Sequence, residues 1–437
     1  MANSNSVHVQ LAHLVFPMLV AGISTPLLGM VDTAVVGHLN DTYYLGAVAL
    51  GAMIFSFLFW GVGFLRMSST ALTARAVGQN DQIQVIVVLL RGLLLAIVIG
   101  LLLISFQNLI SLLVFNIVKS SERVLSFTKE YFDIRIWSAP ASLANYVLLG
   151  WFLGQQKVRI NLLLVVTGNL INIVLDLLFV VVFHWNVKGV AWATLLAEYF
   201  VFLLGIGIAY NYGKFDVLAT LPRVFHIKAI VQYLKFNRDI FLRTFFLLLC
   251  FSFFTATSAR YGELVLAANT VLMNLQTIMA YMLDSIAHAV EALVGKNYFR
   301  EKQKYLETVL RASLLWASSF ALVFSVFYFF FGKWIISLLT SMDKVISLAM
   351  IYLVWLVISP VISVWSYWFD GVYIGANQAK YMRNTMFLSM MVFFTLYFAL
   401  RFWGNNGLWA ALMGFMLTRG LSMAYVFKDK QLLYPRV

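Results

Sequence analysis

Four polar residues that could bind a cation lie inside long apolar stretches of the sequence. Asp32 lies in the apolar run 22–39, and the other three, in two later runs, are Asn172, Asp176 and Thr194. A carboxylate inside an apolar helix costs roughly 2.5–3.5 kcal/mol on insertion scales, so such a residue indicates a function. Two carboxylates, an amide and a hydroxyl suit a proton site or an all-oxygen Na⁺ site, because hard cations prefer oxygen ligands. The sequence therefore predicts a cation- or proton-coupling site.

The spacing of these residues places them on shared helix faces. Asn169, Asn172 and Asp176 are separated by three and four residues, which puts them on one face of a helix. Thr194 and Glu198 are four residues apart and share a face of the next helix. We assign Asn169 and Glu198 to a secondary cavity beside the coupling site.

The composition requires the helices that hold these residues to cross a membrane. The 437 residues are 62% hydrophobic and only 11% charged, whereas soluble domains are about 25% charged. Twelve apolar runs are each long enough to span a bilayer, which predicts an all-α polytopic membrane protein. The net charge of +13 is typical of basic cytoplasmic loops and does not require a nucleic-acid partner. The single cysteine excludes an internal disulfide and a cysteine-cluster metal site.

The chain reads as two repeats joined by a polar linker. The longest polar interruption, 212–237, separates an N-terminal lobe of six helices (1–211) from a C-terminal lobe of six helices (238–437). Four short blocks recur between the halves at offsets of 218 to 221 residues, among them GWFLG at 150–154 and GVYIG at 371–375. An even number of spans per half makes the repeats parallel, and such pseudo-symmetric lobes typically enclose a central cavity.

Lysine and arginine concentrate in the connections after even-numbered spans and at the C-terminal end, which predicts that both termini are cytoplasmic. Residues 1–6 lack a basic segment, so we expect no cleavable signal peptide.

With both termini cytoplasmic, Asp32, Asp176 and Thr194 lie about 9, 12 and 8 Å below the outer ends of their spans. The polar residues can therefore share one level of the N-terminal lobe.

The repeat provides an internal control for the predicted site. The residues that correspond to the coupling residues and to Asn169 in the second half are Phe253, Met390, Phe393, Tyr397 and Leu412. The scaffold therefore recurs, but its carboxylates do not. Polar groups that only joined helices together should recur in part, so the asymmetry favours a coupling role over inter-helix hydrogen bonding.

Pro26 lies in the middle of the first span, where it removes a backbone hydrogen bond and permits a bend. The bend is either static or a hinge that responds to protonation of Asp32. We name Pro26 as the candidate hinge.

The second half contains three acids that could take part in substrate binding or gating. Asp284 and Glu291 share a helix face with His288, a spacing that could hold a metal but more often marks a paired or solvated strip. Asp370 follows Trp365, Tyr367 and Trp368, and an acid among aromatic rings suits a cationic substrate, although aromatic residues also simply pack. Apart from a possible Na⁺ at the coupling site, we expect no metal.

Several motifs resemble those of the multidrug and toxic compound extrusion (MATE) transporters, and within them the DinF-like branch. They are VDTAVVGHL at 31–39, GFLRM at 63–67, TALTA at 70–74, IRIW at 134–137 with Pro140, Asn172 with Asp176, GVAWAT at 189–194, and EALVG at 291–295. The resemblance implies a cation site at Asp32, Asn172, Asp176 and Thr194, with Tyr131 lining the same cavity. It also implies a place in the bacterial cytoplasmic (inner) membrane and the export of amphipathic, often cationic compounds in exchange for H⁺ or Na⁺.

Together these features predict a secondary antiporter and not an enzyme. The sequence contains no G-x-x-x-x-G-K-[ST] run, so we expect no ATP site and no cofactor other than the coupling ion. The alternative is a flippase for a lipid or a lipid-linked saccharide, which would need several arginines for its phosphates. We expect small-molecule substrates, the lipid bilayer as surroundings, no nucleic acid, and function as a monomer.

Overall fold

The computed structural model describes residues 4–37, 42–117, 121–213, 217–298, 303–340 and 342–428. In this part of the chain every regular element is a helix, and twelve helical segments are long and apolar enough to cross a membrane. The predicted all-α fold with twelve spans is therefore confirmed. Four of the spans join two or more elements end to end: α2 with α3, α6 with η1 and α7, α8 with η2, and α15 with η3.

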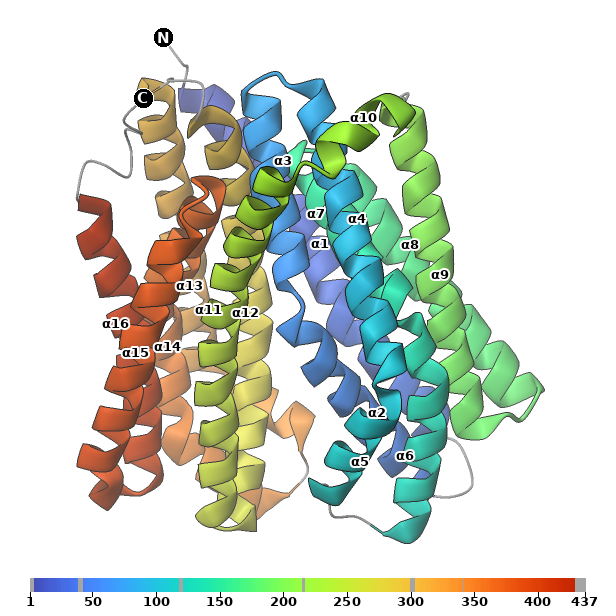
Figure 1. Cartoon of the computed structure of the whole chain (residues 1–437). Coiled ribbons are helices and arrows are strands. Elements are labelled where there is room, and N and C mark those ends of the chain that lie inside the picture. Colours follow the sequence, from blue (N-terminus) through green and yellow to red (C-terminus); the bar gives the residue numbers. More distant parts are fainter. Residues whose placement is uncertain are drawn as a thin grey trace. The chain divides into compact units, whose positions relative to one another are not determined.

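The helices fall into two compact units (Figure 1). Unit 2 comprises Val20–Leu234, and unit 1 comprises Met1–Leu19 together with Lys235–Val437. The helices that begin before residue 227 are α1 (Ser4–Gly37), α2 (Thr42–Gly61), α3 (Phe64–Gly78), α4 (Gln82–Ser105), α5 (Gln107–Ile117), α6 (Glu122–Arg135), η1 (Ile136–Ser138), α7 (Ala139–Gly154), α8 (Val158–Asp176), η2 (Leu177–Val182), α9 (Asn186–Gly213) and α10 (Val217–Val224). The later ones are α11 (Ile227–Arg260), α12 (Glu263–Tyr298), α13 (Gln303–Leu339), α14 (Asp343–Gly375), α15 (Ala379–Leu400), η3 (Arg401–Trp403) and α16 (Asn405–Lys428).

The first part of α1 belongs to unit 1, although it opens the N-terminal half of the sequence. Trp316 Nε1 on α13 donates a hydrogen bond to His8 Nδ1 at 3.0 Å. The Ser285 hydroxyl on α12 donates to the Met18 carbonyl at 3.2 Å. These bonds explain why Met1–Leu19 groups with the later helices. The lobe limits that we drew at 1–211, 212–237 and 238–437 stay a prediction.

Each unit contains the same close packing of two helices. In unit 2, a Cβ atom added to Gly154 on α7 would lie 2.6 Å from the Thr70 carbonyl oxygen on α3. In unit 1, a Cβ added to Gly375 on α14 would lie 2.7 Å from the Glu291 carbonyl oxygen on α12. Both residues of the second pair follow those of the first by 221 residues. The repeat found in the sequence is thus a repeat of backbone contacts that only glycine allows.

The polar linker contains the short helix α10, which is hydrogen-bonded to α4 through a buried arginine. Arg91 on α4 donates from Nε to the Val224 carbonyl at 2.9 Å and from Nη2 to the Arg223 carbonyl. These carbonyls end α10, where a cation satisfies the last backbone acceptors and complements the helix dipole. The contact holds the first part of the linker against α4.

Candidate functional site

The predicted coupling residues of α8 and α9 meet inside unit 2, where these two helices lie side by side (Figure 1). The Asn172 side-chain amide on α8 donates a hydrogen bond to the Thr194 hydroxyl on α9 at 3.2 Å. That hydroxyl in turn donates to the Val190 carbonyl at 3.0 Å, one turn earlier in its own helix. Both side chains are buried. Two of the four predicted site residues are therefore in direct contact.

Asp176 lies one turn beyond Asn172 and is fully buried. It is the last residue of α8, and the chain continues as the π-helical segment Leu177–Val182. Short π-helical segments are frequent at functional sites because the wider turn displaces backbone and side chains from regular positions. The acid and the amide thus share a helix face at the point where the helix changes its geometry.

Asn169 connects α8 to α1, the helix that carries Asp32. Its side-chain amide donates to the Ser24 carbonyl at 3.2 Å. Asp32 and Pro26 lie within α1, but their side chains fall outside the described part of the structure. Their roles as coupling residue and hinge stay predictions. The Asn169 contact brings α1 and α8 together two residues before Pro26.

Glu198 and Tyr131 belong to a polar cluster in unit 2. Asn145 Nδ2 on α7 donates to Glu198 Oε2 at 2.8 Å and to the Glu198 carbonyl at 3.0 Å. The Tyr131 hydroxyl accepts from Arg135 Nη1 at 2.5 Å, and the Arg135 guanidinium lies 5.2 Å from the ring centre of Phe55. Arg135 also interacts electrostatically with Glu198. Asn145 and Arg135 were not among the site residues predicted from the sequence, although a charge inside the apolar fourth span was a signal for Arg135.

The internal control from the sequence has a structural counterpart in unit 1. Phe393 and Leu412, which correspond to Asn172 and Thr194, are both buried apolar side chains. Ser366 and Met416 are the residues of unit 1 that correspond to Asn145 and Glu198. The Ser366 hydroxyl lies 4.0 Å from the Met416 sulfur. The helix contacts therefore recur, while the carboxylate and the amides occur in unit 2 alone at these positions.

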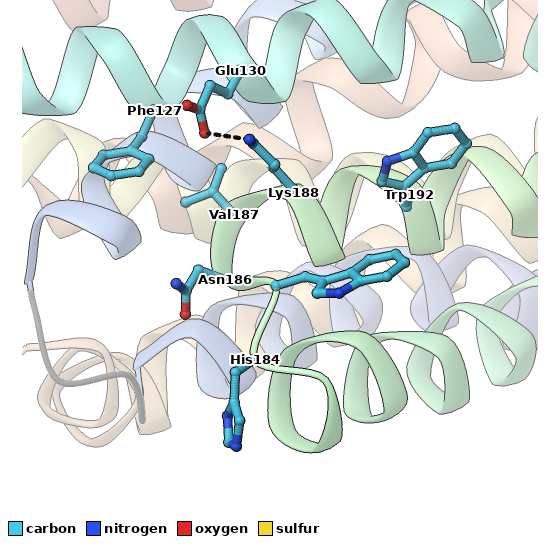
Figure 2. Close-up of a pocket in the computed structure, with 8 residues that line it drawn as sticks. Phe127, Glu130, His184, Asn186, Val187, Lys188 and Trp192 are labelled. Atoms are coloured by element: carbon cyan, nitrogen blue, oxygen red, sulfur yellow. Dashed lines mark ion pairs between the residues drawn. The ribbon is translucent and has the colours of Figure 1, made fainter.

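A cavity of about 490 Å³ opens in unit 2 beside the connection from η2 to α9 (Figure 2). The residues that line it are Phe127, Glu130, His184, Trp185, Asn186, Val187, Lys188 and Trp192. Lys188 Nζ lies 3.9 Å from Glu130 Oε2, and Figure 2 shows Phe127 and Trp192 on either side of this ion pair. This cavity was not predictable from the sequence, because its walls come from two helices and a short turn.

The three acids expected to act in the second half lie in different surroundings in unit 1. Asp370 on α14 accepts hydrogen bonds from Arg243 on α11 and Arg419 on α16. Glu291 is buried and its Oε2 lies 3.7 Å from His288 Nδ1, and Asp284 is half-buried. Among the described residues, no three histidine, cysteine or acidic side chains form a group that could hold a metal. Because Asp370 is paired with two arginines, the aromatic residues before it accompany an acid whose charge is already neutralised.

Comparisons with known proteins agree with this architecture. The model of the MatE family matches residues 17–178 and 240–400. The DNA damage-inducible protein F of Escherichia coli K12 is 44% identical over 433 residues, covering 98% of this chain and 94% of that protein. A probable multidrug resistance protein NorM of Shewanella oneidensis is 25% identical over 349 residues, covering 78% and 75%. A solved structure, described as an outward-facing conformation of a multidrug resistance MATE family transporter, aligns with a TM-score of 0.88 at 18% identity, covering 98% and 97%.

Proposed function

Because this chain belongs to the MatE family, we propose that it is a secondary antiporter that exports amphipathic, often cationic compounds in exchange for H⁺ or Na⁺. The family membership confirms the resemblance inferred from the motifs, and it makes the chain a multi-pass membrane transporter and not an enzyme. The coupling ion, the substrate and the antiport cycle are the proposed part. We also propose that both termini are cytoplasmic and that the protein works as a monomer on small molecules.

The observation that carries the proposal is the hydrogen bond from Asn172 to Thr194 beside the buried Asp176. It joins α8 and α9 with oxygen-rich groups at one depth, which is the donor set that a proton or Na⁺ site requires. A cation that enters from outside neutralises the acid there. Neutralisation removes the cost of burying the charge and so favours one conformation over another.

Asn169 links the effect of cation binding at Asp176 to the first helix, α1. Its bond to the Ser24 carbonyl links the helix that carries Asp176 to the helix that carries Asp32 and Pro26. Binding of the cation at Asp32 and Asp176 then changes the packing of α1 and lowers the affinity for the exported compound. Release of the cation to the cytoplasm resets the transporter.

The test uses proteoliposomes loaded with ethidium, with a proton gradient or a Na⁺ gradient imposed separately. We expect efflux to follow one of the two gradients and to be lost in Asp32→Asn. The matched control is Phe253→Leu, because Phe253 occupies the corresponding position of the second repeat. Normal efflux by Asp32→Asn would refute the coupling role.

A further inference from the structure

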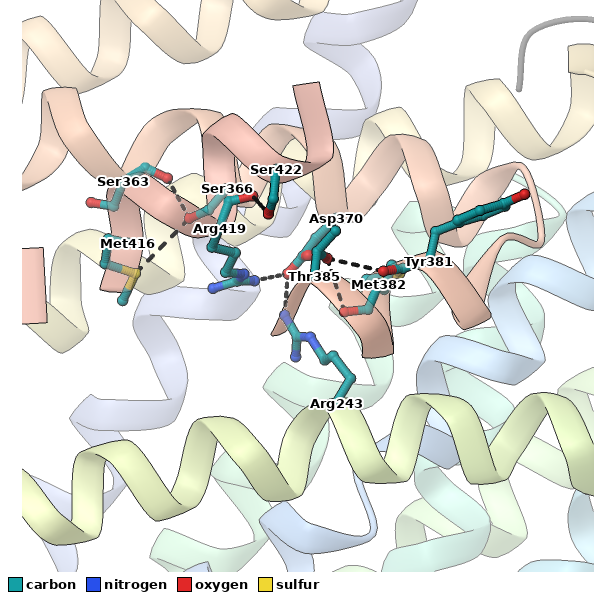
Figure 3. Close-up of polar contacts among 10 residues, drawn as sticks. All are labelled: Arg243, Ser363, Ser366, Asp370, Tyr381, Met382, Thr385, Met416, Arg419 and Ser422. Atoms are coloured by element: carbon teal, nitrogen blue, oxygen red, sulfur yellow. Dashed lines mark hydrogen bonds and ion pairs between the residues drawn. The ribbon is translucent and has the colours of Figure 1, made fainter. Parts of the chain in front are cut away.

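Unit 1 contains a buried cluster of opposite charges that the proposed cation site does not include (Figure 3). A single carboxylate oxygen, Oδ2 of Asp370, accepts hydrogen bonds from Nη2 of both Arg243 and Arg419. The three residues come from α11, α14 and α16 and are 6%, 5% and 1% exposed, in the order Arg243, Asp370, Arg419. We call these three residues the arginine cluster.

The arginine cluster has more hydrogen-bond donors than acceptors. A guanidinium has five N–H donors and no acceptor. The Nε atoms of Arg243 and Arg419 are both buried and have no hydrogen-bond partner in the described part of the chain. A second acid, Asp284, interacts electrostatically with Arg419, but it is only half-buried, so solvent weakens its effect. The cluster therefore retains unused donors, and its two guanidiniums share a single carboxylate oxygen, while Oδ1 of Asp370 is also buried without a hydrogen-bond partner among the described residues.

The arginine cluster is not needed to build a six-helix unit. The residues of the first repeat that correspond to Asp370 and Arg419 are Leu149 and Val201, both apolar. Unit 2 packs the related helices without any charge at these positions. Buried ion pairs are also weak evidence for stability, because apolar residues of similar size often do as well. A binding role explains the cost of the charges better than a structural one.

We propose that Arg243 and Arg419 bind the acidic group of an amphiphilic ligand: a carboxylate, phosphate or sulfonate attached to an apolar body. The Nε–Nη edge of a guanidinium matches two oxygens of such a group. Asp370 holds the arginines when no ligand is bound and competes with the ligand for them. The half-buried Tyr367 ring, 5.8 Å from the Arg419 guanidinium carbon, offers apolar surface next to the charges.

The proposal rests on the proposed transport function for its physiological meaning, and it adds acidic or zwitterionic amphiphiles to the substrate class. The same oxyanion chemistry has two possible sources in a membrane, a free amphiphile and the phosphate of an anionic lipid. The arginine cluster also provides the arginines that a lipid flippase would need.

The experiment measures equilibrium binding of radiolabelled dodecanoate to the purified protein in nanodiscs of phosphatidylcholine, with empty nanodiscs as background. No ion gradient is present, so the result does not depend on antiport. We expect Arg243→Gln and Arg419→Gln to weaken binding by about ten-fold or more, since each removes a charged hydrogen-bond donor. Dodecyltrimethylammonium, which has the same tail and the opposite charge, should bind all variants alike.

Asp370→Asn is the decisive variant, because it keeps both arginines and removes their competitor. We expect it to bind dodecanoate several-fold more tightly, a change that misfolding could not produce. Weaker or unchanged binding by Asp370→Asn, or unchanged binding by both arginine variants, would overturn the proposal. Asp176→Asn should abolish antiport and leave dodecanoate binding intact, which separates this inference from the proposed function.

A second set of nanodiscs that contain phosphatidylglycerol identifies the source of the acidic group. Competition with dodecanoate at the arginine cluster, lost in Arg419→Gln, supports the lipid phosphate as ligand. Absence of competition, with dodecanoate binding retained, supports a free amphiphile.

Discussion

The side-chain amide of Asn172 and the hydroxyl of Thr194 are joined by a hydrogen bond of 3.2 Å that crosses from α8 to α9. The corresponding residues of the second repeat, Phe393 and Leu412, are buried and apolar. The same pair of helices is therefore built with a polar contact in one unit and an apolar one in the other. This difference supports the proposed coupling role of the contact and makes it the first target for mutation.

Thr194→Val replaces the hydroxyl with a methyl group of nearly the same size. We expect the cation concentration for half-maximal ethidium efflux to rise by about ten-fold, because a buried hydrogen bond contributes roughly 1–1.5 kcal/mol. The measurement is efflux from proteoliposomes over a range of cation concentrations. Leu412→Val is the control at the repeat-related position, and an equal shift in both variants would refute the assignment.

Gly375→Ala should destabilise the protein, because the added methyl group would lie 2.7 Å from the Glu291 carbonyl oxygen. Overpacking of this kind typically costs about 1–3 kcal/mol. The readout is the midpoint of thermal unfolding in detergent. Gly207→Ala in α9 is the matched control, since a Cβ there meets no atom within 4 Å. A similar fall in both midpoints would show that the close approach of α12 and α14 is not the cause.

Arg91→Ala should release the linker helix α10 from α4. Two carbonyls at the end of α10 would lose their donors, and the helix would open more often. We expect trypsin to cleave the linker after Arg223 several-fold faster in the variant, since cleavage of a transiently open segment follows its population. Arg123→Gln, at an exposed position near the Tyr43 ring, should leave the rate unchanged. Equal rates for the unsubstituted protein and Arg91→Ala would contradict the docking role.

The predicted orientation can be tested with single cysteines, because the native Cys250 is buried and should react little. His184→Cys, in the exposed connection before α9, should react with a membrane-impermeant maleimide in intact cells. Asn80→Cys, in the exposed connection before α4, should react only after the membrane is permeabilised. The reverse pattern would place both termini outside.

The fold could be predicted from the sequence because its determinants are local. Each apolar run must form a helix in the bilayer, since backbone groups find no partner in lipid. Twelve runs therefore gave twelve spans. The contact of Asn172 with Thr194 was also accessible, because helical spacing and depth below the outer surface constrain both residues.

The partners of the acids were not predictable in the same way. Glu198 bonds Asn145 across 53 positions, and Asp370 bonds Arg243 across 127. Such pairs depend on how helices rotate against one another, which spacing within one helix does not determine. An arginine inside an apolar run was a usable signal for Arg243 and Arg419, because a buried cation requires a partner.

The glycine contacts at Gly154 and Gly375 have a consequence for the history of the molecule. At both positions the glycine backbone lies against the backbone of the neighbouring helix, so the side chains on the other faces of those helices were free to change after a duplication. Each copy could acquire its own buried polar cluster without altering the frame. An engineer could exploit the same independence by transferring either polar cluster to the opposite repeat.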